Sequence, residues 1–381
     1  MIKKLVLLAG AALSGPALAS PHLNWGPRSF DALKAVVTAR ERSDLQRQLR
    51  NTLHHAEEIL KAGKAPPFVD KIEREGVLPS DPRYQASEAA IRGMEDLVSL
   101  ALCSRIAPDA GLASRCLKMA QGTVIGWTHY RSEGNPINDG DLVHVILAAD
   151  LILDALSPGD QATVLRWLTS LRDASDRHFM AASKTSSTRV NNHHTWGLAI
   201  RALAGKLLAN PNLSRGDSVL LTGQAQANLE PPPGWKPDPS CANNAGEPAY
   251  GGYDFRQRDA LHYAVYNLKA WAWVATFAPD LLTPPVRADL AANLQFLGPY
   301  FTGKKTHREF VCSTVPFDIE RRKAGVPEFQ NENWKPERLA KTLRMILPLF
   351  PEIRPWAGVV ETVDGERFSA NTKAIAALMR P

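Results

Sequence analysis

Apolar side chains recur at spacings near three and four along most of the chain, which is the periodicity of amphipathic α-helices. Leu45, Leu49 and Leu53 illustrate the pattern. It predicts helices over residues 30–61, 86–106, 112–127, 141–156, 160–179, 196–208, 215–229, 255–277, 285–300, 336–349 and 367–379. Residues 359–363 are compatible with a short strand. We therefore predict an all-α protein built from helical hairpins.

Three long stretches without helical periodicity interrupt this pattern, at residues 63–84, 230–252 and 303–334. They are rich in proline, glycine, asparagine or charged residues. Loops of this length inside a compact helical domain are more often functional than not. No shift in composition marks a domain boundary, so we expect a single domain over residues 20–381.

The first 19 residues have the three parts of a secretory signal peptide. Two lysines precede a short apolar run at 5–13, and Ala17-Leu18-Ala19 supplies the small residues of a cleavage site. We therefore expect a periplasmic or secreted protein. The apolar run at 142–156 is short and carries Asp150 and Asp154, so no membrane span is expected there.

The net charge of the chain is mildly basic, at +6. Removal of the leader with Lys3 and Lys4 would lower it to about +4 by simple charge counting. This balance suits a polyanionic ligand. Nucleic acid is not expected, because no run of Lys and Arg and no basic stripe with interleaved aromatics occurs.

Four cysteines in an exported chain favour two disulfides, with reduced and buried thiols as the alternative. Cys103 and Cys116 are close in sequence and form the expected pair, which leaves Cys241 with Cys312. A zinc site is not expected because no Cys-x-x-Cys spacing occurs.

Residues Asn191-Asn192-His193-His194-Thr195-Trp196 gather two amides, two imidazoles and an indole at a predicted helix start. Amides donate well to carboxylates, and histidine changes protonation near neutral pH. The pattern indicates a site that holds an anion and moves a proton. The alternative is an asparagine N-cap followed by two ordinary histidines.

A second polar stretch lies about 60 residues later, from Tyr253 to Tyr266. On a continuous helix Asp259, His262, Tyr263 and Tyr266 would share one face, with Arg258 beside His262. The alternative is a helix that packs its tyrosines and histidine inward and leaves its arginines in solvent.

Together the two stretches resemble the alginate lyase family of polysaccharide lyases. The resemblance rests on Asn191-Asn192-His193 with Trp196, on the later helix 260–266, and on the order and spacing of the two motifs. It implies an incomplete α/α toroid that cleaves a polyuronate by β-elimination and leaves 4,5-unsaturated uronic ends. It requires no metal or organic cofactor. We expect a monomer that binds an anionic polysaccharide.

The resemblance also implies roles for particular residues. Abstraction of the C5 proton beside a carboxylate creates a dianionic species, which Asn192 and Arg258 would stabilise. Tyr266 would protonate the O4 leaving group, while His193 neutralises the carboxylate or acts as the base. Trp196 would stack on a sugar ring. Further expected substrate contacts are Asn191, His194, Gln257, His262, Tyr263 and, from the first long loop, Lys71.

One position departs from the family pattern. Asp259 stands where the family has its catalytic arginine if the two tyrosines are aligned. Either Arg258 supplies the charge from a shifted position, or Asp259 orients His262. The departure leaves the substrate open among mannuronan, glucuronan and related polyuronates.

Two other functions remain as alternatives. A helical-toroid glycoside hydrolase would need two carboxylates at the scissile bond, such as Asp139 or Asp141 with Asp259 or Glu247. A binding protein would use the same basic cleft without turnover.

Overall fold

The computed structural model of the chain describes residues 21–40, 43–75, 77–78, 80–182, 187–229, 252–313, 315–364 and 370–379. The regular structure of these residues is helical apart from an isolated β-bridge between Arg308 and Asn333, so the all-α prediction is confirmed. The α-helices are α1 (Phe30–Thr38), α2 (Asp44–Ala62), α3 (Pro82–Ile106), α4 (Ala110–Trp127), α5 (Pro136–Asp139), α6 (Val143–Ile152), α7 (Pro158–Ala181), α8 (Asn192–Leu207), α9 (Pro211–Leu229), α10 (Gly252–Arg258), α11 (Leu261–Phe277), α12 (Pro284–Phe301), α13 (Pro316–Lys323), α14 (Glu337–Ile346), α15 (Ala357–Asp364) and α16 (Ala370–Leu378).

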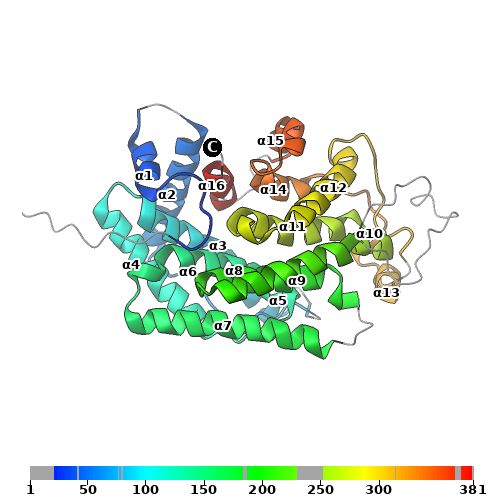
Figure 1. Cartoon of the computed structure of the whole chain (residues 1–381), viewed down its shortest axis with the longest axis horizontal. Helices are drawn as coiled ribbons and strands as arrows, with labels where there is room; N and C mark the ends of the chain where they lie inside the picture. The colour runs from blue at the N-terminus through cyan, green and yellow to red at the C-terminus, as the bar shows by residue number, and fades with distance from the viewer. Residues whose placement is uncertain are drawn as a thin grey trace, which may run out of the picture.

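The helices pack in a circuit that returns to its starting point. Going along the chain, α2 packs on α3, α3 on α6, α6 on α8, α8 on α11, α11 on α14 and α14 on α16. Helix α16 then packs on α2, which brings the end of the described chain back to the first helices (Figure 1). Helices α4, α7 and α9 pack against members of this circuit. One large apolar cluster runs through the circuit and forms the core.

The helix predicted over residues 30–61 is two helices, so that prediction is wrong in this detail. Ser29 caps α1 and Ser43 caps α2, each through its side-chain oxygen. The Gln46 amide donates to the carbonyl of Ala39 at 2.5 Å, which satisfies a carbonyl at the end of α1. Serine is a favoured N-cap because it supplies the acceptor that the first helical N–H groups lack.

Residues 359–363 form part of α15 and not a strand, and the irregular stretch 303–334 contains α13. The stretch 63–84 has no helix before Pro82, where α3 begins. Much of the stretch 230–252 lies outside the described residues, and so do Cys241 and Glu247. The predicted signal peptide also lies outside them.

The Cys103–Cys116 disulfide is present and joins α3 to α4, as predicted. The pairing of Cys312 with Cys241 involves a residue outside the described part. Among the described helices, none combines the length and apolarity that a membrane crossing needs.

Candidate functional site

The two polar stretches that lie 60 residues apart in sequence meet in space. The backbone N–H of Asn192 donates to Asp254 at 2.8 Å, and its side-chain amide donates to the same carboxyl at 2.6 Å. One helical turn on, the Trp196 indole N–H donates to the Tyr266 carbonyl at 3.1 Å. The start of α8 is thus tied to both α10 and α11.

Helix α8 begins with the asparagine cap that its sequence allows. The Asn191 side chain accepts from the His193 N–H at 3.0 Å, so Asn191 caps the helix and its side-chain oxygen is engaged there. Asp254 places a carboxyl at the same end, where the helix dipole favours negative charge. Burial raises the pKa of Asp254 to about 7, although the two Asn192 donors act in the opposite direction.

The predicted helix 255–277 is broken at Asp259, so Asp259 and the residues after it do not share one helical face. Helix α10 ends at Arg258 and α11 begins at Leu261, because Asp259 adopts a left-handed conformation with φ of 51°.

Asp259 is buried. Its carboxyl accepts from the Cys312 N–H at 2.7 Å, and its carbonyl accepts from the Phe310 N–H at 2.7 Å. The His307 ring lies 3.0 Å from that carbonyl. Asp259 therefore anchors the segment 307–312, and the proposed orienting role toward His262 is not supported.

A stripe of partly exposed polar side chains runs along α11, whose other residues are mostly buried. These side chains are His262, Tyr263, Tyr266 and Lys269. The last three follow helical spacing, so they line one face. On a helix that is otherwise in the core, this face is the part that remains partly exposed. We call these four residues the α11 stripe.

Arg258 is paired and not free to meet a substrate carboxylate with its full charge. Its Nε donates to Asp318 at 3.0 Å, and its Nη2 donates to the other carboxyl oxygen. Asp318 is fully buried and also accepts from Ser313 at 2.6 Å. The guanidinium of Arg258 lies 3.8 Å from the centre of the Tyr263 ring. The expectation that Arg258 supplies the family arginine's charge is therefore weakened, since Asp318 balances that charge.

His193 is half-buried, and no hydrogen bond joins its ring to the described residues. Burial lowers the pKa of His193 to about 4, and nearby Arg258 lowers it further while Glu75 opposes the shift. The ring is therefore neutral at pH 7. A neutral imidazole can accept a proton but cannot neutralise a carboxylate, which favours the base among the two expected roles.

His194 packs against helices α7 and α9. Its Nδ1 lies 2.8 Å from the Gln224 side-chain oxygen on α9, and its ring packs 4.5 Å from that of Phe179 on α7. These contacts give His194 a structural role, and its expected contact with substrate is not supported.

The Trp196 side chain is in the core, with 1% of its surface exposed. Its ring packs against that of Tyr266 at 5.3 Å. The prediction that Trp196 stacks on a sugar ring is therefore wrong, because neither face of its indole ring is open to solvent. Lys71 forms an exposed ion pair with Glu133 at 2.8 Å, which fits a solvated surface charge. Gln257 is half-exposed beside Arg258 and stays a candidate contact.

The two tyrosines of the α11 stripe have different surroundings. The Tyr263 ring lies between the Arg258 guanidinium and the His262 ring, which stacks on it at 4.2 Å. Tyr266 lies one turn further on. Burial raises the pKa of Tyr266, the nearby Asp141 raises it further, and Arg74 opposes the shift.

A buried acid, Glu309, contacts the backbone of His262 at the start of α11. Burial lowers the pKa of His262 to about 3. Its backbone N–H donates to Glu309 at 3.1 Å, and Glu309 is itself buried. Burial raises the pKa of Glu309 to about 8. The acid therefore supplies a cap for α11, which has no side-chain cap of its own.

The sequence did not predict Lys269 as part of the site, nor the pairing of Arg74 with Asp141. Arg74 pairs with Asp141 at 3.1 Å, and burial lowers the pKa of Lys269. Lys269 is three residues after Tyr266, so one more turn of the same helical pattern would have found it. No local pattern predicts the Arg74–Asp141 pair, because Arg74 reaches Asp141 from the irregular stretch before α3.

Three of the carboxylates named for a glycoside hydrolase, Asp139, Asp141 and Asp259, have other partners. Asp139 is buried and accepts from the Tyr130 hydroxyl at 2.5 Å and from Ser132 at 2.6 Å. Asp259 is tied to Cys312 as described. In the described part of the chain, no group of His, Cys, Asp or Glu side chains could hold a metal ion.

Comparisons of the chain with protein-family models, with curated proteins and with solved structures found no match.

Proposed function

We propose that the protein is a polysaccharide lyase that cleaves a polyuronate by β-elimination, with its reaction centre between the start of α8 and the α11 stripe. The observation that carries the proposal is the pair of hydrogen bonds from Asn192 to Asp254, which brings the two polar motifs together. The closed circuit of helix contacts supports the proposed α/α toroid.

The chemistry needs a base at C5, a donor at O4 and stabilisation of the negative charge that forms on the substrate carboxylate. His193 is neutral at pH 7 and is the proposed base. Asn192 is buried and its amide donates to Asp254, so Asn192 holds the start of α8 in place, and the partly exposed Gln257 on the adjacent helix is the proposed neutral donor. A well-placed neutral donor to a developing oxyanion contributes about 3–4 kcal/mol to the transition state.

Tyr263 is the proposed proton donor to O4, in place of Tyr266. Arg258 connects Tyr263 to the proposed base, because it contacts the Tyr263 ring and lowers the pKa of His193. The groups that shift the pKa of Tyr266 are instead Asp141, Arg74 and Tyr263. Tyr263 and His193 are thus both influenced by the charge of Arg258, which favours Tyr263 as the proposed acid.

An absorbance assay on several polyuronates tests the function, because β-elimination creates a conjugated double bond that absorbs at ~235 nm, a property of the reaction class. We expect turnover on at least one of mannuronan, guluronan and glucuronan.

Tyr263→Phe should lower kcat by at least ~10² by removing the general acid. Tyr266→Phe is the matched control and should have a smaller effect. The reverse order would return the role to Tyr266, and no absorbance on any polyuronate would remove the proposal.

A further inference from the structure

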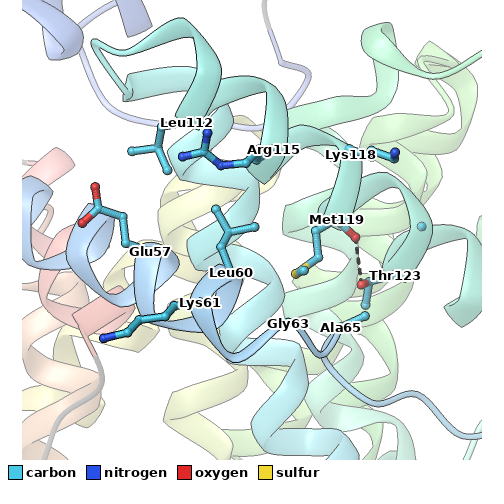
Figure 2. Close-up of a pocket in the computed structure, with 11 residues that line it drawn as sticks. Glu57, Leu60, Lys61, Gly63, Ala65, Leu112, Arg115, Lys118, Met119 and Thr123 are labelled. Carbon is cyan, nitrogen blue, oxygen red and sulfur yellow. Dashed lines mark hydrogen bonds between the residues drawn. The ribbon is translucent and has the colours of Figure 1, made fainter.

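A groove with a volume of about 780 Å³ lies between the C-terminal end of α2 and helix α4. None of the residues that line it belongs to the candidate site. Its apolar lining includes Leu60 of α2 with Leu112 and Met119 of α4. Figure 2 shows these three side chains pointing into the space between the two helices.

Cationic side chains surround this apolar floor. Lys61, Arg115 and Lys118 line the groove and are exposed, while Glu57 is the one carboxylate in the lining. Lys61 has a partial counter-charge in Glu58 at 3.9 Å. Arg115 and Lys118 lie on α4, and their two positive charges outnumber the single negative charge of Glu57. The mouth of the groove therefore favours an anion.

The walls of the groove are fixed by the fold. Cys116, next to Arg115, is joined by its disulfide to Cys103, which holds α4 on α3. Helix α2 ends at Gly63, whose left-handed conformation with φ of 66° turns the chain out of the helix. Ligand sites are usually preformed in this way, and volumes of about 300–1,000 Å³ are typical of small-molecule pockets.

We propose that this groove binds a single-chain anionic amphiphile such as a fatty acid. The alkyl chain lies on Leu60, Leu112 and Met119, and the anionic head group meets Arg115 and Lys118. Burial of the methylenes supplies most of the affinity, because apolar surface leaves water, and the cations select the head group. The site is independent of the lyase function.

Gly122 allows a sharp test, because it lines the groove and a Cβ at this position would meet no heavy atom within 4 Å. The Cβ of Gly122→Phe therefore meets open space, and we expect its ring to occupy part of the groove. Gly223 on α9 is the matched control, since it is also exposed, helical and open around its Cβ. Phenylalanine is a better helix former than glycine, so both variants should fold.

The measurement is calorimetric titration of the purified protein with dodecanoate below its micelle concentration. We expect saturable binding to the wild type, at least ~10-fold weaker binding to Gly122→Phe, and binding within about twofold of wild type for Gly223→Phe. Charge reversal by Arg115→Glu with Lys118→Glu should weaken binding about fivefold. Dodecanol should bind more weakly than dodecanoate.

Three results would overturn the proposal. They are the absence of saturable binding, equal binding by Gly122→Phe and wild type, and equal affinity for dodecanol and dodecanoate. A dimer that dissociates in Gly122→Phe would assign the groove to a second copy of the chain instead.

Discussion

Two buried carboxyl groups at the candidate site carry pKa values near neutrality. Asp254 takes its hydrogen bonds from Asn192, and Glu309 accepts from the His262 N–H. Burial raises the pKa of Asp254 to about 7 and that of Glu309 to about 8. Both groups therefore hold a proton in the folded chain at pH values where the unfolded chain has released it.

This difference predicts how stability depends on pH. A group whose pKa is higher in the folded chain stabilises it below the unfolded pKa, and that stability is lost as the pH rises through the folded pKa. For Asp254 the window runs from 3.8, the ordinary value, to about 7. We expect the free energy of unfolding, measured by denaturant titration, to fall between pH 5 and pH 8.

The Asp254→Asn variant should lose part of this pH dependence, because the amide does not titrate in the window. Glu309 accounts for the remaining part. Asp31→Asn, at an exposed carboxyl on α1, is the control and should keep the wild-type slope. An unchanged slope in Asp254→Asn would contradict the raised pKa.

The lowered pKa of His193 also predicts how catalysis depends on pH. If His193 is the base, kcat/KM should fall on the acid side with an apparent pKa of about 4, since that parameter reports the free enzyme. The rate on the substrate found by the absorbance assay should therefore stay level from pH 7 down to about pH 5. If kcat/KM instead fell on the acid side with an apparent pKa of about 6.5, the ordinary histidine pKa, the buried imidazole would be excluded as the base.

The sequence could predict that the residues from Asn191 to Trp196 meet those from Tyr253 to Tyr266, because both stretches concentrate polar groups beside apolar helices. It could not predict that Trp196 is buried, since an indole suits a core and a sugar platform equally. Nor could it predict the partner of Arg258. Asp318 is 60 residues away and looks like an ordinary acid in the first turn of a short helix.

At the scale of elements, the break between α10 and α11 shows where local patterns fail. The apolar periodicity continues through residues 255–277, and nothing in it marks Asp259. The left-handed conformation of Asp259 is favoured by its contacts with Phe310 and Cys312, which come from a distant part of the chain. Tertiary contacts of this kind outweigh helix propensity, which is a weak preference per residue.

The Arg258–Asp318 pair links α10 to α13. Removal of one partner leaves a buried charge, which costs about 3–5 kcal/mol. We expect Asp318→Leu to lose that much stability by urea denaturation. The double variant Arg258→Met with Asp318→Leu should recover most of it, since apolar replacements of both partners are often neutral.

The same variants separate structure from catalysis. The recovered double variant should remain impaired in turnover, because the cation over the Tyr263 ring is gone. Full activity in that variant would restrict Arg258 to a structural role. Failure of the double variant to regain stability would instead show that the ion pair itself holds α13.

At the scale of the whole molecule, helical periodicity predicted the all-α class and the closely spaced Cys103–Cys116 disulfide followed from the cysteine positions. The circuit of helices could not be derived in the same way. It depends on the return of α16 to α2, a contact between residues more than 300 positions apart that no local pattern encodes.

The circuit places the start of α8 beside α10 and α11. The proposed lyase chemistry depends on this arrangement. β-Elimination breaks the C4–O4 bond without water, whereas hydrolysis adds the elements of water to the new ends. The two reactions therefore differ in the mass of their products.

Mass spectrometry of the products formed in ¹⁸O-labelled water distinguishes the two reactions. For β-elimination we expect oligouronates that are lighter by one water than hydrolysis products, with no ¹⁸O at the cleaved bond and none formed by His193→Ala. Incorporation of one ¹⁸O at each cleaved bond would contradict it and identify a hydrolase.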